Sequence, residues 1–168
     1  MIVFVLGGAR SGKSEIAEDM AAALGEEVTY LATGWRPDGT DQSWAARVAA
    51  HRLRRPTGWR TVEVGADLAT ALAEAAGPAL VDSLGAWVAG TEAFAVDVEA
   101  VCDALLSRRA RGAPTVIVSD EVGFGVTPST ASGNAFRDAL GEANRAVSAV
   151  ADEAWLVVAG RRLRLDAP

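Results

Sequence analysis

The chain is short of three residue types that often carry chemistry. In 168 residues it has one lysine (Lys13), one histidine (His51) and one cysteine (Cys102). A single cysteine excludes an internal disulfide and any CxxC metal or redox site. A Ser-His-Asp hydrolase would have to use His51. Because each of these residues is the only one of its kind, each position needs its own explanation.

Basic charge and long apolar runs are scarce as well. The chain has 16 basic against 22 acidic residues and a net charge of −6, which argues against a general nucleic-acid or anionic-membrane binder. The apolar segment 1–6 is too short for a signal-peptide core or a membrane span. We therefore expect a cytoplasmic protein with no nucleic-acid partner and no stable membrane insertion. Half of the residues are hydrophobic, enough for one globular domain over residues 1–168.

Apolar runs of strand length alternate along the chain with segments of helical periodicity, separated by Gly, Pro and Asp. The pattern predicts strands at 2–6, 28–32, 59–64, 79–82, 115–119, 154–159 and 162–165, the last two as a hairpin. It predicts helices at 14–24, 42–54, 67–75, 92–111 and 134–151. This order indicates an α/β fold with a mostly parallel sheet, helices on both faces and an antiparallel C-terminal edge. Ligands of such sheets bind beyond the carboxyl ends of the strands.

A glycine-rich motif follows the first predicted strand and precedes the first predicted helix. It matches GxxxxGK[ST] and consists of Gly7, Gly8, Ala9, Arg10, Ser11, Gly12, Lys13 and Ser14. Such a loop turns backbone N–H groups toward a phosphate, its lysine reaches the β and γ phosphates, and its Ser hydroxyl ligates Mg²⁺. Regulatory GTPases also need an Asn-Lys-x-Asp element, which is excluded here because the only lysine lies in the loop.

A metal at such a loop usually needs a second carboxylate at the end of a neighbouring strand. Asp82 ends the apolar run 79–82 and is the first candidate to share Mg²⁺ with Ser14. Asp120 and Glu121 end another apolar strand and compete for this role. Asp82 has an alternative role as the N-cap of the segment that follows it.

Arginines gather around the single histidine. Five of the fifteen arginines lie between residues 47 and 60, with His51 among them. Trp44, Val48 and His51 share one helical face, so a packing helix with solvated arginines is one interpretation. Arginine also holds phosphates bidentately, and a neutral imidazole is a competent nucleophile toward phosphorus. The cluster therefore also suggests a second phosphate contact or a phosphohistidine-type intermediate.

Further motifs follow the glycine-rich loop in a specific order. They are Tyr30-Leu31-Ala32-Thr33, then Ala46-Arg47-Val48-x-x-His51 with Arg55-Pro56 and Trp59-Arg60-Thr61, then Glu121-Val122-Gly123-x-Gly125, Phe136-Arg137-Asp138 and Ala151-Asp152-Glu153. Their order and spacing resemble the bifunctional adenosylcobinamide kinase/adenosylcobinamide-phosphate guanylyltransferase family of cobalamin biosynthesis. The resemblance covers nearly the whole chain.

The resemblance implies a three-layer, RecA-like P-loop NTPase fold and two linked reactions. ATP or GTP would phosphorylate adenosylcobinamide; GTP would then guanylylate His51, and GMP would pass to the cobinamide phosphate. The resemblance also implies a homotrimer. By residue-by-residue match, the nucleotide contacts would be the loop from Gly7 to Ser14 together with Ala32, Thr33, Gly34, Arg52, Leu53, Arg54, Arg55, Glu63 and Asp82.

Two other functions remain open on the residues alone. One is a P-loop kinase of another small hydroxylated metabolite in which His51 is structural; it predicts ATP preference and no acid-labile GMP adduct. The other is a non-catalytic nucleotide-binding module, which predicts tight binding without turnover. Cys102, on the apolar side of the predicted helix 92–111, is expected to be a core residue.

Overall fold

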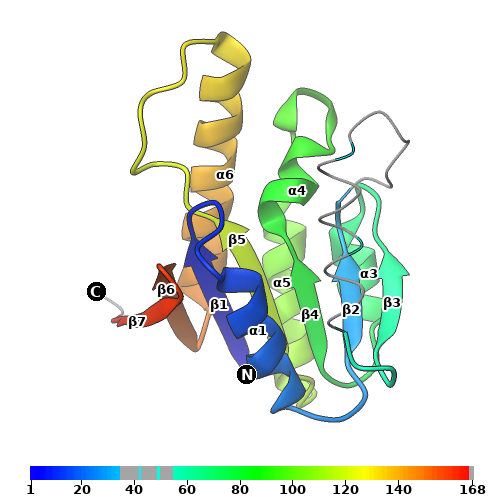
Figure 1. Ribbon diagram of the computed structural model, residues 1–168. Coiled ribbons are helices and arrows are strands. Elements are labelled where there is room, and N and C mark those ends of the chain that lie inside the picture. Colours follow the sequence, from blue (N-terminus) through cyan, green and yellow to red (C-terminus); the bar gives the residue numbers. More distant parts are fainter. Residues whose placement is uncertain (35–41, 43–48, 50–54, 167–168) are drawn as a thin grey trace.

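A seven-stranded sheet forms the centre of the computed structural model, which describes residues 1–34, 42, 49 and 55–166 (Figure 1). The strand order is β3-β2-β4-β5-β1-β6-β7. All neighbours from β3 to β6 are parallel, and β6 pairs antiparallel with β7. The strands are β1 (Ile2–Gly7), β2 (Thr29–Ala32), β3 (Arg60–Glu63), β4 (Ala79–Asp82), β5 (Thr115–Asp120), β6 (Glu153–Val158) and β7 (Arg161–Leu165). The expected mostly parallel sheet with an antiparallel C-terminal edge is confirmed.

Helices cover both faces of the sheet, as expected. Successive side chains of the fully buried β1 alternate between the faces: Val3 and Val5 pack toward α1, while Phe4 packs with the helices of the other face. The helices are α1 (Lys13–Ala22), α3 (Leu68–Glu74), α4 (Leu84–Ala89), η1 (Glu92–Phe94, a 3₁₀ turn), α5 (Val98–Ala110) and α6 (Ala131–Val150). Among the described helices, only α1 lies on the face to which Val3 and Val5 point (Figure 1). None of the described helices combines the length and apolar character needed to cross a bilayer.

Capping residues explain why two helices begin at other residues than expected and where one helix that was not predicted begins. The helix predicted at 92–111 is wrong in its first turn: α5 begins at Val98, where Asp97 accepts a hydrogen bond from Ala100 N at 2.9 Å. Helix α4 was not predicted. Its N-cap is Ser83, which accepts from Ala86 N at 3.2 Å, so the alternative in which Asp82 caps this segment is wrong. Thr130 caps α6, which therefore starts at Ala131.

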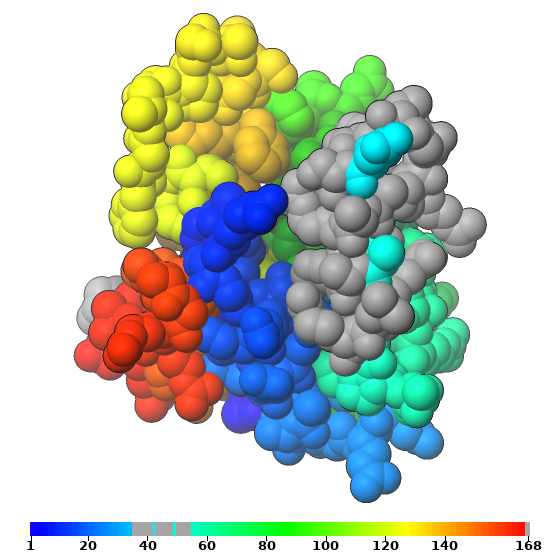
Figure 2. Space-filling view, viewed as in Figure 1, coloured from blue at the N-terminus to red at the C-terminus, as the bar shows by residue number. Residues whose placement is uncertain are grey.

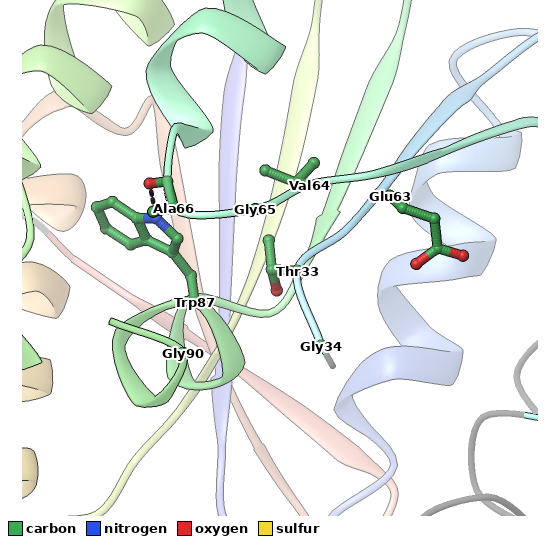
Figure 3. Close-up of a pocket in the computed structure, with 8 residues that line it drawn as sticks. All are labelled: Thr33, Gly34, Glu63, Val64, Gly65, Ala66, Trp87 and Gly90. Atoms are coloured by element: carbon green, nitrogen blue, oxygen red, sulfur yellow. Dashed lines mark hydrogen bonds between the residues drawn. The ribbon is translucent and has the colours of Figure 1, made fainter. Parts of the chain in front are cut away.

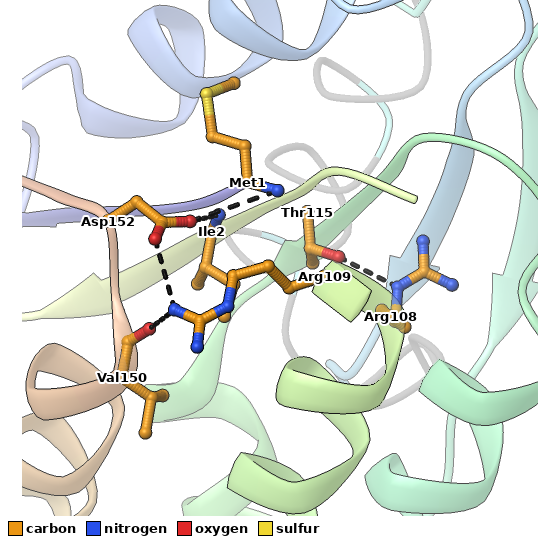
Figure 4. A network of polar contacts seen from close by, with 7 residues as sticks. All are labelled: Met1, Ile2, Arg108, Arg109, Thr115, Val150 and Asp152. Atoms are coloured by element: carbon orange, nitrogen blue, oxygen red, sulfur yellow. Dashed lines mark hydrogen bonds and ion pairs between the residues drawn. The ribbon is translucent and has the colours of Figure 1, made fainter. Parts of the chain in front are cut away.

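A fully buried arginine connects α5 to α3 and β5. Arg108 Nε donates to Thr115 Oγ1 at 2.8 Å, and its guanidinium also donates to the carbonyl oxygens of Leu72, Ala75 and Gly77 at 3.0, 2.5 and 2.7 Å (Figure 4 draws the Thr115 bond). These oxygens lie at and just beyond the end of α3, where helix carbonyls lack partners within the helix. Burial lowers the pKa of Arg108 to about 10, so the side chain remains charged at neutral pH and caps α3.

The N-terminal end of β1 is held by the segment before β6. Ile2 N donates to Asp152 Oδ2 at 2.7 Å and Asp152 N donates to Ile2 O at 2.9 Å. The exposed Arg109 side chain contacts the same carboxylate, with its Nη1 3.1 Å from Asp152 Oδ1 (Figure 4). Cys102 is a free, half-buried thiol against the core, as expected, and burial raises its pKa.

Candidate active site

The glycine-rich motif forms a turn between β1 and α1. Gly12 adopts a φ of 93°, a left-handed conformation that glycine accepts without steric cost, and it precedes the first residue of α1. Ser11 N donates to Gly8 O at 3.2 Å within the loop. The exposed residues Gly8 to Arg10 lie at the surface, in the dark blue part of Figure 2. The expected strand–loop–helix context of a phosphate loop is therefore present.

The β6–β7 hairpin, at the edge of the sheet next to β1, supports this loop. Gly160, in the β6–β7 turn, donates its N–H to Ser11 O at 2.8 Å. A Cβ added at Gly7 would lie 2.8 Å from the carbonyl oxygen of Val157 in β6. Only glycine fits such a close approach of two backbones. The loop is thus held between its own strand and the C-terminal hairpin.

The last two side chains of the motif, those of Lys13 and Ser14, contact different carboxylates. Lys13 Nζ lies 2.7 Å from Asp120 Oδ1, and it also donates to Gly8 O at 3.2 Å. Ser14 Oγ donates to Asp82 Oδ1 at 3.5 Å. These acids end β5 and β4, which are adjacent in the sheet. The third candidate, Glu121, accepts a hydrogen bond from Gly123 N at 2.5 Å in the loop that follows.

The donor set at Ser14 and Asp82 fits Mg²⁺, which prefers oxygen ligands, keeps several waters and is completed by substrate phosphates. A dedicated protein cage is absent from the described residues, which contain no group of three or more His, Cys, Asp or Glu side chains that could hold a metal.

Asp120 is held in place from two other helices. Asn144 Nδ2, on α6, donates to Asp120 O at 3.0 Å, and Asn144 Oδ1 accepts from Ser119 Oγ at 2.6 Å. A Cβ added at Gly85, on α4, would overlap the Asp120 carboxylate. Sequence reasoning did not assign these supports. The available signal was a polar residue within the apolar α6 face made by Leu140, Ala143 and Val147.

Asp82 has a second donor that the sequence did not reveal. Tyr30 OH donates to Asp82 Oδ2 at 2.5 Å. Burial of Tyr30, reinforced by the nearby Asp82 charge, raises the pKa of the phenol well above its usual value, so the hydroxyl stays protonated and donates. The Arg55 guanidinium carbon lies 3.4 Å from the centroid of the Tyr30 ring.

Three predicted nucleotide contacts line one cavity at the carboxyl ends of β2 and β3. The cavity has a volume of about 290 Å³ and is lined by Thr33, Gly34, Glu63, Val64, Gly65, Ala66, Trp87 and Gly90 (Figure 3). Trp87 Nε1 donates to Ala66 O at 2.8 Å, and Thr33 Oγ1 donates to Ser83 O at 2.6 Å. In Figure 3, Glu63 and Trp87 lie at opposite sides of the set of labelled lining residues. Ala32 is the last residue of β2.

The structure thus brings together the loop from Gly7 to Ser14 and Asp82 at one point, and Thr33, Gly34 and Glu63 at another. Arg55 contacts both β2 and β3: its guanidinium lies over the ring of Tyr30, and its Nη1 donates to Thr61 Oγ1 at 3.1 Å. His51, Arg52, Leu53 and Arg54 lie outside the described residues, so their expected roles stay predictions.

Fold and site together define a P-loop nucleotide-binding protein suited to chemistry on phosphates. Comparison with known families narrows this class. The family described as "Cobinamide kinase / cobinamide phosphate guanyltransferase" (CobU) matches residues 3–165. The chain belongs to this family of enzymes.

Curated relatives agree with this assignment. The chain is 36% identical over 165 residues to the bifunctional adenosylcobalamin biosynthesis protein CobP of Pseudomonas aeruginosa, covering 93% of this chain and 92% of the relative. It is 34% and 33% identical to the proteins of the same description named CobU from Salmonella typhimurium and Escherichia coli, with 95% of this chain and 97% of each relative covered.

Proposed function

We propose that this enzyme carries out two linked reactions in cobalamin biosynthesis. In the first, the γ-phosphoryl group of ATP or GTP passes to the aminopropanol hydroxyl of adenosylcobinamide. In the second, an imidazole nitrogen of His51 displaces pyrophosphate from GTP, and the resulting GMP passes to the cobinamide phosphate to give adenosylcobinamide-GDP. The cytoplasm supplies these nucleotides and is the proposed location.

The observation that carries the proposal is the pairing of Lys13 and Ser14 with carboxylates that end two adjacent strands. Phosphoryl transfer needs little covalent help from a protein and depends on positioning and charge stabilisation. Lys13 and the loop N–H groups would bind the phosphates. Ser14 and Asp82 would hold Mg²⁺, which neutralises charge on the phosphate oxygens when it is bound.

The cavity beside Glu63 is the proposed site for the guanine base. A carboxylate accepts hydrogen bonds from the N–H groups on the Watson–Crick edge of guanine, whereas adenine offers an acceptor at the corresponding ring nitrogen. Glu63 is exposed at the cavity wall. This arrangement supports GTP as the substrate of the second reaction.

Arg55 would contribute to the phosphate contacts of that reaction together with Arg52 and Arg54. Its Nε is buried and has no hydrogen-bond partner within the described part of the chain. A buried guanidinium donor with spare capacity suits an anionic ligand, because arginine pairs bidentately with phosphate oxygens.

The covalent step has a direct test. Incubation with GTP labelled at the α-phosphorus should label the protein, mass spectrometry should find one added GMP, and mild acid should remove it. Because His51 is the only histidine, His51→Ala should abolish the label while leaving the kinase reaction in place. GTP labelled at the γ-phosphorus is the matched control and should leave no label on the protein.

Labelling that persists in His51→Ala would refute the histidine assignment. Absence of any adduct, together with ATP-dependent phosphorylation of another hydroxylated metabolite, would favour the simpler kinase. We further propose that the enzyme is a homotrimer, which light scattering coupled to size-exclusion chromatography measures. A monomeric mass would contradict that part of the proposal.

A further inference from the structure

Tyr30 occupies a position that the proposed reactions do not assign a role. It is the only tyrosine of the chain, it lies on β2 and its side chain is almost completely buried. Its hydroxyl and its ring have different main partners, although the charge of Arg55 also acts on the phenol. The hydroxyl contacts Asp82, and one face of the ring carries the Arg55 guanidinium.

Strand register explains how the phenol reaches Asp82. In the β2–β4 pair, Tyr30 is opposite Leu80 and Ala32 is opposite Asp82. Tyr30 and Asp82 therefore project from the same face as diagonal neighbours, a separation that a long aromatic side chain can bridge. That face is the one covered by α1, which begins with Lys13 and Ser14.

The hydroxyl sets the orientation of the carboxylate. The Tyr30 hydroxyl donates to Oδ2 of Asp82 at 2.5 Å, and the other carboxylate oxygen, Oδ1, lies 3.5 Å from Ser14 Oγ. A donor fixed on one oxygen restricts rotation of the carboxylate about its terminal torsion, which is otherwise broad. Replacement of a side chain that orients a metal ligand in this way typically weakens metal binding by about 10- to 100-fold.

The ring holds a different group. The guanidinium carbon of Arg55 lies 3.4 Å from the ring centroid, and Trp59 packs nearby with its ring centroid 6.4 Å from that of Tyr30. A cation over a buried aromatic face is attracted by the ring quadrupole. Tyr30 thereby touches both a proposed metal ligand and a proposed phosphate ligand.

We propose that Tyr30 is a positioning residue that orients Asp82 for Mg²⁺ through its hydroxyl and holds Arg55 for the phosphates through its ring. The inference rests on the proposed function and adds to it a separation of roles within one side chain. Removal of the hydroxyl affects the metal requirement, and removal of the ring also affects guanylylation.

Two variants separate these roles. Tyr30→Phe keeps the ring and removes the donor to Asp82; it should raise the Mg²⁺ concentration needed for half-maximal binding of a fluorescent GTP analogue by about tenfold. Tyr30→Leu removes the ring as well and should, in addition, slow labelling by α-labelled GTP at saturating Mg²⁺. The binding measurement involves no turnover and no corrinoid.

Thr29→Val is the matched control. Thr29 precedes Tyr30 on the same strand, is buried, and donates its hydroxyl to Ala76 O at 3.3 Å, away from Asp82. This variant also loses one buried hydroxyl but should leave the Mg²⁺ requirement unchanged. Thermal unfolding and circular dichroism establish that each variant folds.

A double-mutant cycle with Asp82→Asn makes the test specific, because groups that act through one another are not additive. In the Asp82→Asn background, Tyr30→Phe should cause no further change in the Mg²⁺ requirement. A folded Tyr30→Phe protein with the Mg²⁺ requirement of the wild type, or an additive effect in the cycle, would overturn the inference. If the wild type itself bound GTP without any Mg²⁺ dependence and formed no GMP adduct, the proposed function would fail instead.

Discussion

Replacement of Arg108 by methionine is expected to cause a large loss of stability, although the residue lies far from the proposed chemistry. Methionine keeps much of the aliphatic length of the side chain and removes the guanidinium. Four acceptors then lose a donor: the hydroxyl oxygen of Thr115 and the carbonyl oxygens of Leu72, Ala75 and Gly77.

The size of the loss follows from opposing contributions. A buried polar group left without its partner costs about 1–3 kcal/mol, so four such groups set an upper bound that local relaxation and water entry reduce. The variant also avoids the desolvation of a charged group, the main cause of the lowered pKa of Arg108. Because the variant leaves four neutral acceptors and no unpaired charge, we expect a net loss in the free energy of unfolding of about 3–5 kcal/mol, near the lower limit of the sum for four unsatisfied acceptors.

Urea unfolding followed by tryptophan fluorescence measures this loss, and a thermal midpoint lowered by about 10 °C should accompany it, at about 2–4 °C per kcal/mol for a chain of this length. Arg109→Met, at the next position, is the matched control. The Arg109 side chain is 41% exposed and pairs with Asp152, itself 37% exposed. Exposed ion pairs contribute about 0–1 kcal/mol. Equal losses in the two variants would refute the assignment of Arg108 as the cap of α3.

Three further predictions concern the loop and its supports. Gly7→Ala should destabilise the fold by about 1–3 kcal/mol and lower its unfolding temperature, because the added Cβ meets a backbone oxygen of β6. Gly8→Ala is the control and should leave the unfolding temperature unchanged, because its Cβ meets nothing within 4 Å; equal shifts in the two variants would contradict the steric argument. Lys13→Ala should weaken GTP binding about 10- to 100-fold in calorimetric titration, as expected from the loss of a charged contact; an unchanged affinity would count against the phosphate-loop role. Asn144→Leu should lower the free energy of unfolding by about 1–3 kcal/mol, because the carbonyl of Asp120 loses its donor; urea unfolding with a loss below that range would show that this support is dispensable.

Local patterns in the sequence predicted most of the fold. The apolar run 79–82 forms β4 with the same bounds, and the run 115–119 forms β5 with one added residue. Apolar periodicity and glycine placement depend on neighbours in the chain, so they can be recognised in the sequence. Helix starts were less predictable, since Ser83, Asp97 and Thr130 each compete with nearby residues for the capping position.

Only some contacts between distant residues in the site could be predicted. The proximity of Ser14 and Asp82 was expected from their shared role at a metal, whereas the contact of Lys13 with Asp120 was not, because it depends on the order in which β1 and β5 lie in the sheet. The phenol–carboxylate contact of Tyr30 depends on strand register. Arg108 resembles a solvated base in the last turn of a helix, and only the packing of α3 against α5 buries it.

The two ends of β1 are held by residues close to one another near the end of the sequence. Asp152 bonds to Ile2 at the start of the strand, and Gly160 bonds to Ser11 in the loop beyond its end. During synthesis Asp152 and Gly160 emerge about 140 to 150 residues after the motif at residues 7–14. Such long-range closure is slow compared with local helix formation. Ribosome-bound chains halted before residue 152 should therefore fail to retain GTP, and nucleotide binding should appear only after residues 152 to 160 have emerged.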